Sequence, residues 1–325
     1  MTRPDHAPSA DHAADAMPAP QLSIQLSNFA DEAPTSWTSL LGVAECADRA
    51  GIDRVVVSDH IVLGERLDAY SDPSTGGTAG GKQPTGPDGC WLEPLTLLSV
   101  ITGRTTRVRL GTAVLLAALR PAAVLAKQLA TLDQLSAGRL DLGVGVGWQR
   151  EEYEVVGLDF ADRGSALDDC LRLCRQLWTQ QIVDGEFGSL RFDRVHAMPK
   201  PIQPGGVPIW VSGRATPRTA RRVAEYGIGW IPWGDDIAEP EAGIALMRTA
   251  LAAAGRDPNL LQVQGVLPLV RDAGAVDVDA SMCGLPALLA RGITDVRVHN
   301  RWGVDAAADE ALMSDLARAF RAAST

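Results

Sequence analysis

Strand-like and helix-like segments alternate along nearly the whole of this 325-residue chain. Short apolar runs such as Arg54–Asp59 are followed by longer amphipathic stretches, which is typical of parallel strands joined by helices. Because right-handed crossovers join parallel strands, such a chain forms a doubly wound open sheet or a closed barrel. Eight repeats without a linker favour the closed form, a single-domain α/β fold of the (β/α)8 TIM-barrel class with insertions. The eight expected strands are Leu22–Phe29, Arg54–Asp59, Arg107–Leu116, Arg139–Val146, Val207–Gly213, Ile228–Gly234, Leu260–Val270 and Ile293–Asn300.

The boundaries of this domain follow from composition. Residues 1–20 are rich in Ala, Pro, Asp and His and lack an apolar core, which predicts a disordered tail rather than a secretory signal. The barrel domain is therefore expected over residues 21–325. Two insertions interrupt the alternation, at about 61–90, rich in Gly, Pro, Ser and Thr, and at about 180–206, where Asp184–Phe192 indicates a hairpin. Segments of this length often frame a substrate pocket and close over it.

Charge and residue usage exclude several classes of partner. The net charge of −10 and the pI near 5.0 argue against nucleic acid but permit an anionic small molecule in a local positive pocket. No apolar run is long enough to predict a membrane span. The five cysteines are odd in number and mostly far apart, which predicts buried thiols in a reducing cytoplasm. Cys170 and Cys174 share a helix face and supply at most half of a metal site, so no metal is expected.

The segment Arg139–Tyr153, RLDLGVGVGWQREEY, raises the question of a dinucleotide site because it carries three glycines spaced by two. A dinucleotide fingerprint needs G-x-G-x-x-G at the start of a helix, normally in the first βαβ unit. Here Trp148 replaces the third fingerprint glycine and the segment is the fourth strand, which disfavours that reading. We interpret Gly143, Gly145 and Gly147 as the carboxyl end of a barrel strand, where a flat ligand approaches bare backbone.

Four segments that occur in order resemble the luciferase-like monooxygenase superfamily, which also contains the deazaflavin-dependent reductases. They are Ala47–His60 (ADRAGIDRVVVSDH), Arg107–Leu116 (RVRLGTAVLL), Leu125–Trp148 (LAKQLATLDQLSAGRLDLGVGVGW) and Pro208–Gly213 (PIWVSG). The resemblance implies an oxidoreductase with an insertion-bearing TIM barrel that binds coenzyme F420 or FMN at the carboxyl end of its strands. It also implies a homodimer, and a separate flavin or deazaflavin reductase that supplies the reduced cofactor.

The Asp59–His60 pair looks like that of the deazaflavin branch, in which the aspartate meets the cofactor and the histidine handles a proton. An imidazole suits proton exchange at neutral pH, because its ordinary pKa is near 6.5. From the residues alone, Asp59 equally fits a loop cap and His60 a hydrogen-bonded structural histidine. With the barrel in place, we expect His60 to be the catalytic residue.

Further cofactor contacts are implied at the ends of three later strands. In relatives a non-proline cis peptide bulges against the ring system, and its counterpart here lies between Ala113 and Val114. Sugar-phosphate dehydrogenases of the family carry a glutamate where this chain has Trp148, which argues against that reaction. Around Arg214, backbone donors, a hydroxyl and a cation near a helix N-terminus suit a cofactor phosphate. The expected cofactor-binding residues are Asp59, Gly111, Thr112, Ala113, Val114, Gly147, Trp148, Glu151, Ser212, Gly213 and Arg214.

Alternative functions remain at this stage. Hydride transfer between F420 and a small organic substrate is preferred because of Asp59–His60, in either direction, reduction or alcohol oxidation. A two-component monooxygenase that uses reduced FMN is the main alternative, and a flavin-binding protein without catalysis is a weaker one. A metal hydrolase on the same barrel needs an H-x-H pair on the first strand, which the sequence SIQLSNF lacks. No motif identifies the substrate.

Overall fold

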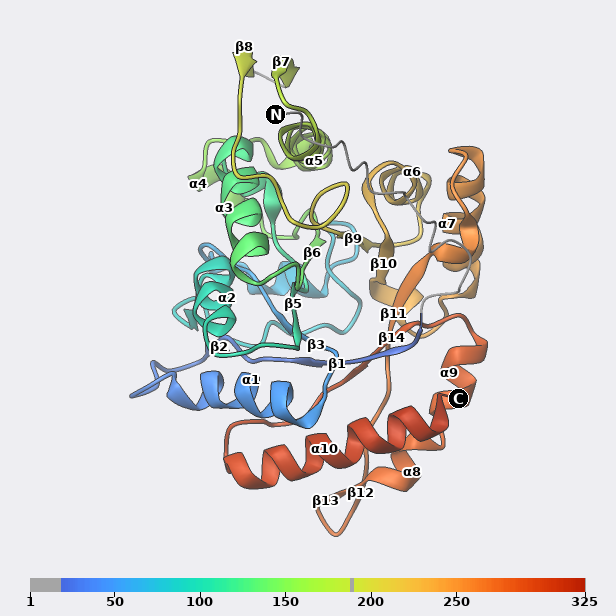
Figure 1. The fold of residues 1–325 in the computed structure, drawn as a ribbon. Coiled ribbons are helices and arrows are strands. Elements are labelled where there is room, and N and C mark those ends of the chain that lie inside the picture. Colours follow the sequence, from blue (N-terminus) through green and yellow to red (C-terminus); the bar gives the residue numbers. More distant parts are fainter. Residues whose placement is uncertain (1–18, 188–189, 325) are drawn as a thin grey trace, which may run out of the picture.

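The computed structural model describes residues 19–187 and 190–324 as one domain around a closed barrel of eight parallel strands (Figure 1). The barrel strands are β1 (Gln21–Gln25), β3 (Arg54–Val57), β5 (Arg109–Thr112), β6 (Leu140–Val144), β9 (Ile209–Gly213), β10 (Gly229–Pro232), β11 (Gln262–Val266) and β14 (Asp295–Val298). They are neighbours in chain order, and β14 pairs with β1 to close the ring. The predicted TIM barrel is confirmed.

Helices surround the barrel between successive strands (Figure 1). They are α1 (Thr38–Ala50), α2 (Pro94–Thr102), α3 (Ala122–Leu135), α4 (Arg150–Val155), α5 (Arg163–Thr179), α6 (Pro217–Tyr226), α7 (Glu241–Ala253), α8 (Val278–Met282), α9 (Leu285–Ala290) and α10 (Ala306–Ala323). The short helix α4 begins two residues after Trp148 and was not expected from the sequence. Its position places two adjacent glutamates at the carboxyl end of the barrel.

The two insertions have different structures. Residues 61–90 form a loop with one short 3₁₀ turn, Leu67–Ser71, and end in β4 (Cys90–Trp91), which pairs with β2 (Phe29–Ala30). The second insertion carries the expected hairpin, β7 (Val183–Phe187) and β8 (Leu190–Val195). A further small hairpin, β12 (Val270–Asp272) and β13 (Ala275–Asp277), was not anticipated. The expected disordered tail falls almost entirely outside the described residues.

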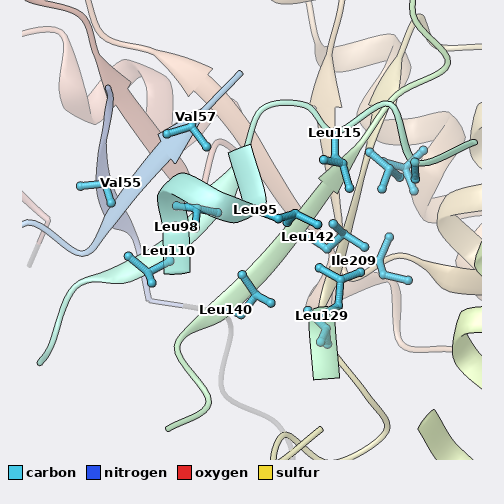
Figure 2. Packing of buried hydrophobic residues seen from close by; sticks show 14 of the residues in the cluster. Val55, Val57, Leu95, Leu98, Leu110, Leu115, Leu129, Leu140, Leu142 and Ile209 are labelled. Atoms are coloured by element: carbon cyan, nitrogen blue, oxygen red, sulfur yellow. The ribbon is translucent and has the colours of Figure 1, made fainter. Parts of the chain in front are cut away.

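Most of the apolar core lies between the barrel and its helices. Alternate strand residues such as Val55, Leu110 and Leu142 point outward and are fully buried together with Leu98 of α2 and Leu129 of α3 (Figure 2). This alternation is what a strand requires, since successive side chains face opposite sides of the sheet. The inward positions of the same strands are consequently free to carry polar groups.

The interior of the barrel is unusually polar near its amino end. Arg54 Nε lies 3.1 Å from Asp141 Oδ2, and its guanidinium stacks 4.3 Å above the ring of Trp210. Arg109 binds the same carboxylate through two hydrogen bonds, 2.7 and 2.8 Å long. Arg54 and Asp141 are both buried. Buried charges are usually paired and hydrogen-bonded. Arg54 has its carboxylate partner and donates to Gln21, although its Nε lacks a well-formed hydrogen bond.

The cysteines are less uniform than expected. Cys46, Cys170 and Cys174 are buried, but Cys90 is half-buried and Cys283 is exposed, so the prediction of buried thiols is wrong for Cys283. The reason is that Cys283 follows α8 at the surface rather than facing the core. Among the described residues, none of the helices combines the length and the apolar character that a membrane crossing requires.

Candidate functional site

A cavity of about 590 Å³ opens at the carboxyl ends of the strands. All eight barrel strands or the residues directly after them line it, and the loop 61–90 adds Tyr70, Gly76, Gln83 and Pro84. The predicted residues among its lining are Asp59, His60, Ala113, Val114, Gly147, Trp148, Ser212, Gly213 and Arg214. Residues predicted at the ends of four separate strands therefore share one cavity, at the place where TIM barrels carry their active sites.

His60 faces a buried carboxylate inside this cavity. Its Nδ1 lies 3.2 Å from Oε2 of Glu152, whose side chain is fully buried on α4. Neither atom has a well-formed hydrogen bond to any other described residue, whereas Oε1 of Glu152 accepts one from the amide of Ile61 at 2.9 Å. The rings of Trp91 and Trp148 contact the imidazole edge-on, with centroids 4.7 and 5.9 Å away. The result is a histidine–carboxylate couple held between two indoles.

Asp59 lines the cavity, but its carboxylate is engaged by the protein. Arg120 binds both oxygens, at 2.7 and 3.0 Å, and the amide of Leu116 donates to Oδ2 at 2.9 Å. Arg120 also pairs with Glu93 at 2.9 Å, which links β3, the segment after β5 and α2. These bonds hold the loop after β5, which carries Leu116 and Arg120, in place. Asp59 thereby holds that loop against the barrel, and its predicted contact with a cofactor stays a prediction.

The peptide bond between Ala113 and Val114 is cis, as the resemblance implied. The neighbouring strand must be glycine-rich to allow this shape: a Cβ on Gly145 would lie 2.7 Å from Cγ2 of Val114, and one on Gly143 would meet the carbonyl oxygen of Thr112. Gly145 and Gly147 also line the cavity, so the interpretation of this strand end as a surface for a flat ligand stays a prediction. Because Gly143 and Gly145 have no side chains, the end of β5 can pack closely against them. The bulge at Ala113 and Val114 lines the cavity.

Three arginines, which we call the cationic wall, line one side of the cavity: Arg163, Arg214 and Arg218. They lie at or just before the N-termini of α5 and α6, near Ser212 and Gly213. The Nε atoms of Arg163 and Arg214 are buried and lack a hydrogen-bond partner in the described chain. Burial lowers the pKa of Arg163, and the nearby Arg150 and Arg218 cations add to this effect. Uncompensated cations beside helix N-termini form a ready anion site.

Aromatic rings enclose the mouth of the cavity. Tyr70 from the loop 61–90 meets Trp148 and Trp233 edge-on, with centroid distances of 5.3 and 6.0 Å. On the other side Phe29 stacks on Trp91 at 4.4 Å. Trp148 is buried, and it contributes to the cavity lining as well as to packing. These rings make one part of the cavity apolar, which suits an uncharged organic group.

Other predicted residues lie outside the cavity lining. Glu151 points away and pairs with Arg66 at 2.6 Å near the surface. Gly111 and Thr112 lie within β5, below the bulge, and the hydroxyl of Thr112 donates to the carbonyl of Gly143 at 2.7 Å. Sequence reasoning missed Glu152 because the two adjacent glutamates can be distinguished only once the start of α4 is known. The available signal was the pair Glu151–Glu152 directly after a barrel strand.

Comparison with curated proteins finds relatives among actinobacterial proteins. An uncharacterised protein of Mycobacterium tuberculosis is 39% identical over 170 residues, a match that covers 51% of this chain and 58% of that protein. The F420-dependent glucose-6-phosphate dehydrogenase of Mycolicibacterium gilvum is 30% identical over 230 residues, which cover 68% of this chain and 61% of the relative. The chain thus spans a little more than half of the length of these relatives.

Solved structures share the fold at low sequence identity. The monooxygenase RslO1 of Streptomyces bottropensis superposes with a TM-score of 0.73 at 21% identity, covering 93% of this chain and 99% of that one. An F420-dependent secondary alcohol dehydrogenase bound to an F420–acetone adduct gives 0.72 at 18% identity, covering 93% and 99%. A riboflavin lyase with modified FMN gives 0.61 at 18% identity, covering 78% and 63%.

The match to a family profile covers nearly the whole chain. It extends over residues 21–323, which is the whole barrel with both of its insertions. It also agrees with the closed parallel barrel, the cis peptide after β5 and the position of the cavity. The chain belongs to the luciferase-like monooxygenase family.

Proposed function

We propose that this protein is an F420-dependent oxidoreductase, which transfers a hydride between the deazaflavin and a small organic substrate. The observation that carries the proposal is the 3.2 Å contact of the buried Glu152 with His60, which lines the same cavity as the bulge at Ala113–Val114. Hydride transfer to a carbonyl, or from an alcohol, needs a group that gives or takes a proton beside the redox ring. His60 is placed for this task.

The cavity fits the cofactor on several counts. The bulge after β5 presents backbone and the small side chains of Ala113 and Val114, which suit a flat ring. The cationic wall carries two buried Nε atoms that the described part of the chain leaves without partners, as a phosphate site requires. Ser212 and Gly213 add a hydroxyl and backbone donors at the same place. When bound there, the cofactor would supply the hydride-transfer chemistry.

The protein's own contribution is proton handling and exclusion of water. Because Nδ1 of His60 faces Glu152, the opposite nitrogen, Nε2, is the one left to exchange a proton with the substrate oxygen. The carboxylate faces Nδ1 at 3.2 Å and thereby orients the ring. Trp91 and Trp148 cover the imidazole on two sides, which limits the access of bulk water to it. Tyr70 and its loop border the mouth above them.

The choice of F420 over FMN is supported by the F420-dependent relative that is 30% identical and by the cavity's proton-handling couple. A binding titration tests it directly. We expect F420 to bind the purified protein at micromolar concentrations and FMN to bind at least about ten-fold more weakly. The reverse order would favour the reduced-FMN monooxygenase instead, with oxygen consumption as its readout. Binding of neither cofactor would contradict both enzymes.

Two partners belong to the same proposal. A hydride carrier that leaves oxidised must be reduced again, so a separate deazaflavin reductase would supply it. A homodimer in the cytoplasm is the expected assembly, and light scattering of the purified protein measures it. A mass equal to that of a single chain would contradict the dimer without affecting the cofactor assignment.

A further inference from the structure

The closed end of the cavity, below the bulge, holds a cation that neither the cationic wall nor the His60 couple uses. Arg297 on β14 lines the cavity although its residue is only 6% exposed. Its two contacts among the described residues are long: 3.4 Å from Nε to Ser23 Oγ and 3.5 Å from the guanidinium to Asp295 Oδ2. Good hydrogen bonds of this kind are about 2.7–3.2 Å long. A buried guanidinium with five donors is thus poorly satisfied by the protein.

The charges around Arg297 leave a positive excess. Asp295 is shared between Arg297 and Arg54, whose NH1 lies 3.7 Å away, while Asp141 is shared between Arg54 and Arg109. Arg109 also interacts electrostatically with the buried Asp133, so the shortage of negative charge falls on Arg297, which shares its one carboxylate with Arg54. Burial lowers the pKa of Arg297, and the Asp295 carboxylate opposes this only in part. An arginine remains charged in a protein, so the excess calls for an anion.

Neighbouring groups complete a polar floor. Arg297 lies on β14 and His299 directly follows the strand, and both side chains line the cavity. Burial, together with the Arg297 cation, lowers the pKa of His299, so its imidazole is neutral at pH 7. Gln264 on the adjacent strand β11 also lines the cavity. These side chains add neutral hydrogen-bonding capacity beside the cation.

The floor is separate from the cationic wall. Strand β14, which carries Arg297, and strand β9, after which Arg214 lies, are separated in the barrel by β11 and β10. Among the described lining residues the single carboxylate is Asp59, and Arg120 neutralises it. The cavity is therefore positive at two places, although the whole chain carries a net charge of −10.

We propose that Arg297, His299 and Gln264 form a second anion site that anchors a carboxylate group of the substrate at the floor of the cavity. The substrate class is then a small organic acid whose apolar part lies among the aromatic rings of the mouth. Only the identification of this ligand as a substrate rests on the proposed function. The anion site itself does not depend on which cofactor binds, and it is measured in cofactor-free protein.

The test uses benzoate as a probe carboxylate and benzamide as its uncharged counterpart. Trp91, Trp148 and Trp233 line the cavity, so tryptophan fluorescence and calorimetry both report binding. We expect benzoate to bind the parent protein at least ten-fold more tightly than benzamide, and Arg297→Gln to abolish this preference, about a ten-fold loss or more. Arg301→Gln, an exposed arginine four residues further on, is the matched control and leaves benzoate binding unchanged.

A competition experiment between benzoate and inorganic phosphate in the parent protein tests the second anion site even if the Arg297→Gln variant does not fold. Inorganic phosphate, which reports the cationic wall, and benzoate should bind together, and Arg218→Gln should weaken phosphate alone. Mutual displacement, equal binding of benzoate and benzamide, or an unchanged benzoate affinity in a folded Arg297→Gln variant would each overturn the proposal. A loss of F420 affinity in Arg297→Gln without any loss of benzoate binding would instead assign the charge to the cofactor ring. Benzoate and phosphate binding are measured in cofactor-free protein, so they can be interpreted even if F420 does not bind.

Discussion

At the amino end of the barrel, Asp48 accepts hydrogen bonds from the amides of Thr106, Arg107 and Val108, at 3.0, 2.7 and 2.7 Å, and from the Thr106 hydroxyl at 3.2 Å. At the carboxyl end, Glu152 is more deeply buried, but its Oε2 meets only Nδ1 of His60. Both are carboxylates that folding removes from water. Both oxygens of Asp48 accept hydrogen bonds from the protein, whereas one of the two oxygens of Glu152 faces only the imidazole of His60.

The same contrast holds for the cations at the two ends. Near the amino end, Arg139 donates to the carbonyls of Ser136, Thr105 and Val108 and to the Thr105 hydroxyl. At the carboxyl end, the Nε atoms of Arg163 and Arg214 have no partner among the described residues. An unsatisfied buried polar group costs about 1–3 kcal/mol, so a fold retains it only where something else uses it. In these pairs unmet hydrogen-bonding capacity, rather than charge or burial, separates the groups beside the cavity from those of the scaffold, although the scaffold also holds unpartnered buried atoms such as Nε of Arg248 and Nε1 of Trp302.

The strongest test of this contrast is removal of the imidazole. In His60→Ala we expect turnover to fall by about 10²–10⁴-fold, because no other group at the cavity replaces the proton exchange. The dissociation constant of F420 and the melting temperature should change little. Turnover is followed through the absorbance of the cofactor with an accepted carbonyl or alcohol substrate. The exposed His196→Ala is the control, and an equal loss of cofactor affinity and turnover in His60→Ala would make it a binding residue.

Asp59 and Arg120 show that position alone does not separate site from scaffold. They lie at the carboxyl end of the barrel, but they are paired with each other. Arg120→Met leaves the Asp59 carboxylate buried without its cation, so we expect a loss of about 3–5 kcal/mol in the free energy of unfolding. Urea denaturation measures it. Arg49→Met, which removes an exposed pair with Glu310, is the control and should leave stability nearly unchanged. A stable Arg120→Met variant that loses only F420 binding would show that Asp59 serves the cofactor.

Glu152→Gln tests whether the couple depends on its carboxylate. Glu152 touches neither substrate nor cofactor in this arrangement, so it acts as a positioning residue through His60. An amide keeps the shape but removes the charge that orients the imidazole, and we expect turnover to fall by about 10–100-fold. The affinity for F420 and the melting temperature should stay within error of the parent. A purely structural role would lower stability and cofactor affinity together, without a selective effect on turnover.

The fold was predictable from the sequence because hydrophobic alternation and strand order depend on local pattern. The residues at strand ends followed from the resemblance, and the cis bond between Ala113 and Val114 was confirmed. What the sequence could not supply were pairings across the barrel. Arg120 reaches Asp59 from 61 residues away, and its choice depends on how the segment after β5 folds back. Likewise, whether Arg297 faces the interior depends on the register of β14, which a one-residue slip would reverse.

Asp48 extends the contrast to pH. Burial alone would raise the pKa of this carboxyl, but the hydrogen bonds from residues 106–108 outweigh it, and the pKa is lowered below the ordinary 3.8. A lowered folded-state pKa means that its stabilisation is complete above the unfolded value and is lost as the pH falls through the folded one. We expect Asp48→Asn to cost about 1–3 kcal/mol at pH 7 and progressively less below pH 4. Denaturation at both pH values measures this, and a pH-independent cost would contradict it.

The smallest effect is expected at Glu151. It lies next to Glu152 at the same end of the barrel, but it pairs with the exposed Arg66 and lines no part of the cavity. Glu151→Gln should leave turnover, F420 affinity and melting temperature almost unchanged, because solvent replaces what the pair provides. It is also the matched control for Glu152→Gln, with the same chemical change one residue away. If Glu151→Gln lowered turnover as much as Glu152→Gln, nearness to the mouth rather than unmet capacity would define the site, and the reading of His60 and Glu152 as a couple would lose its basis.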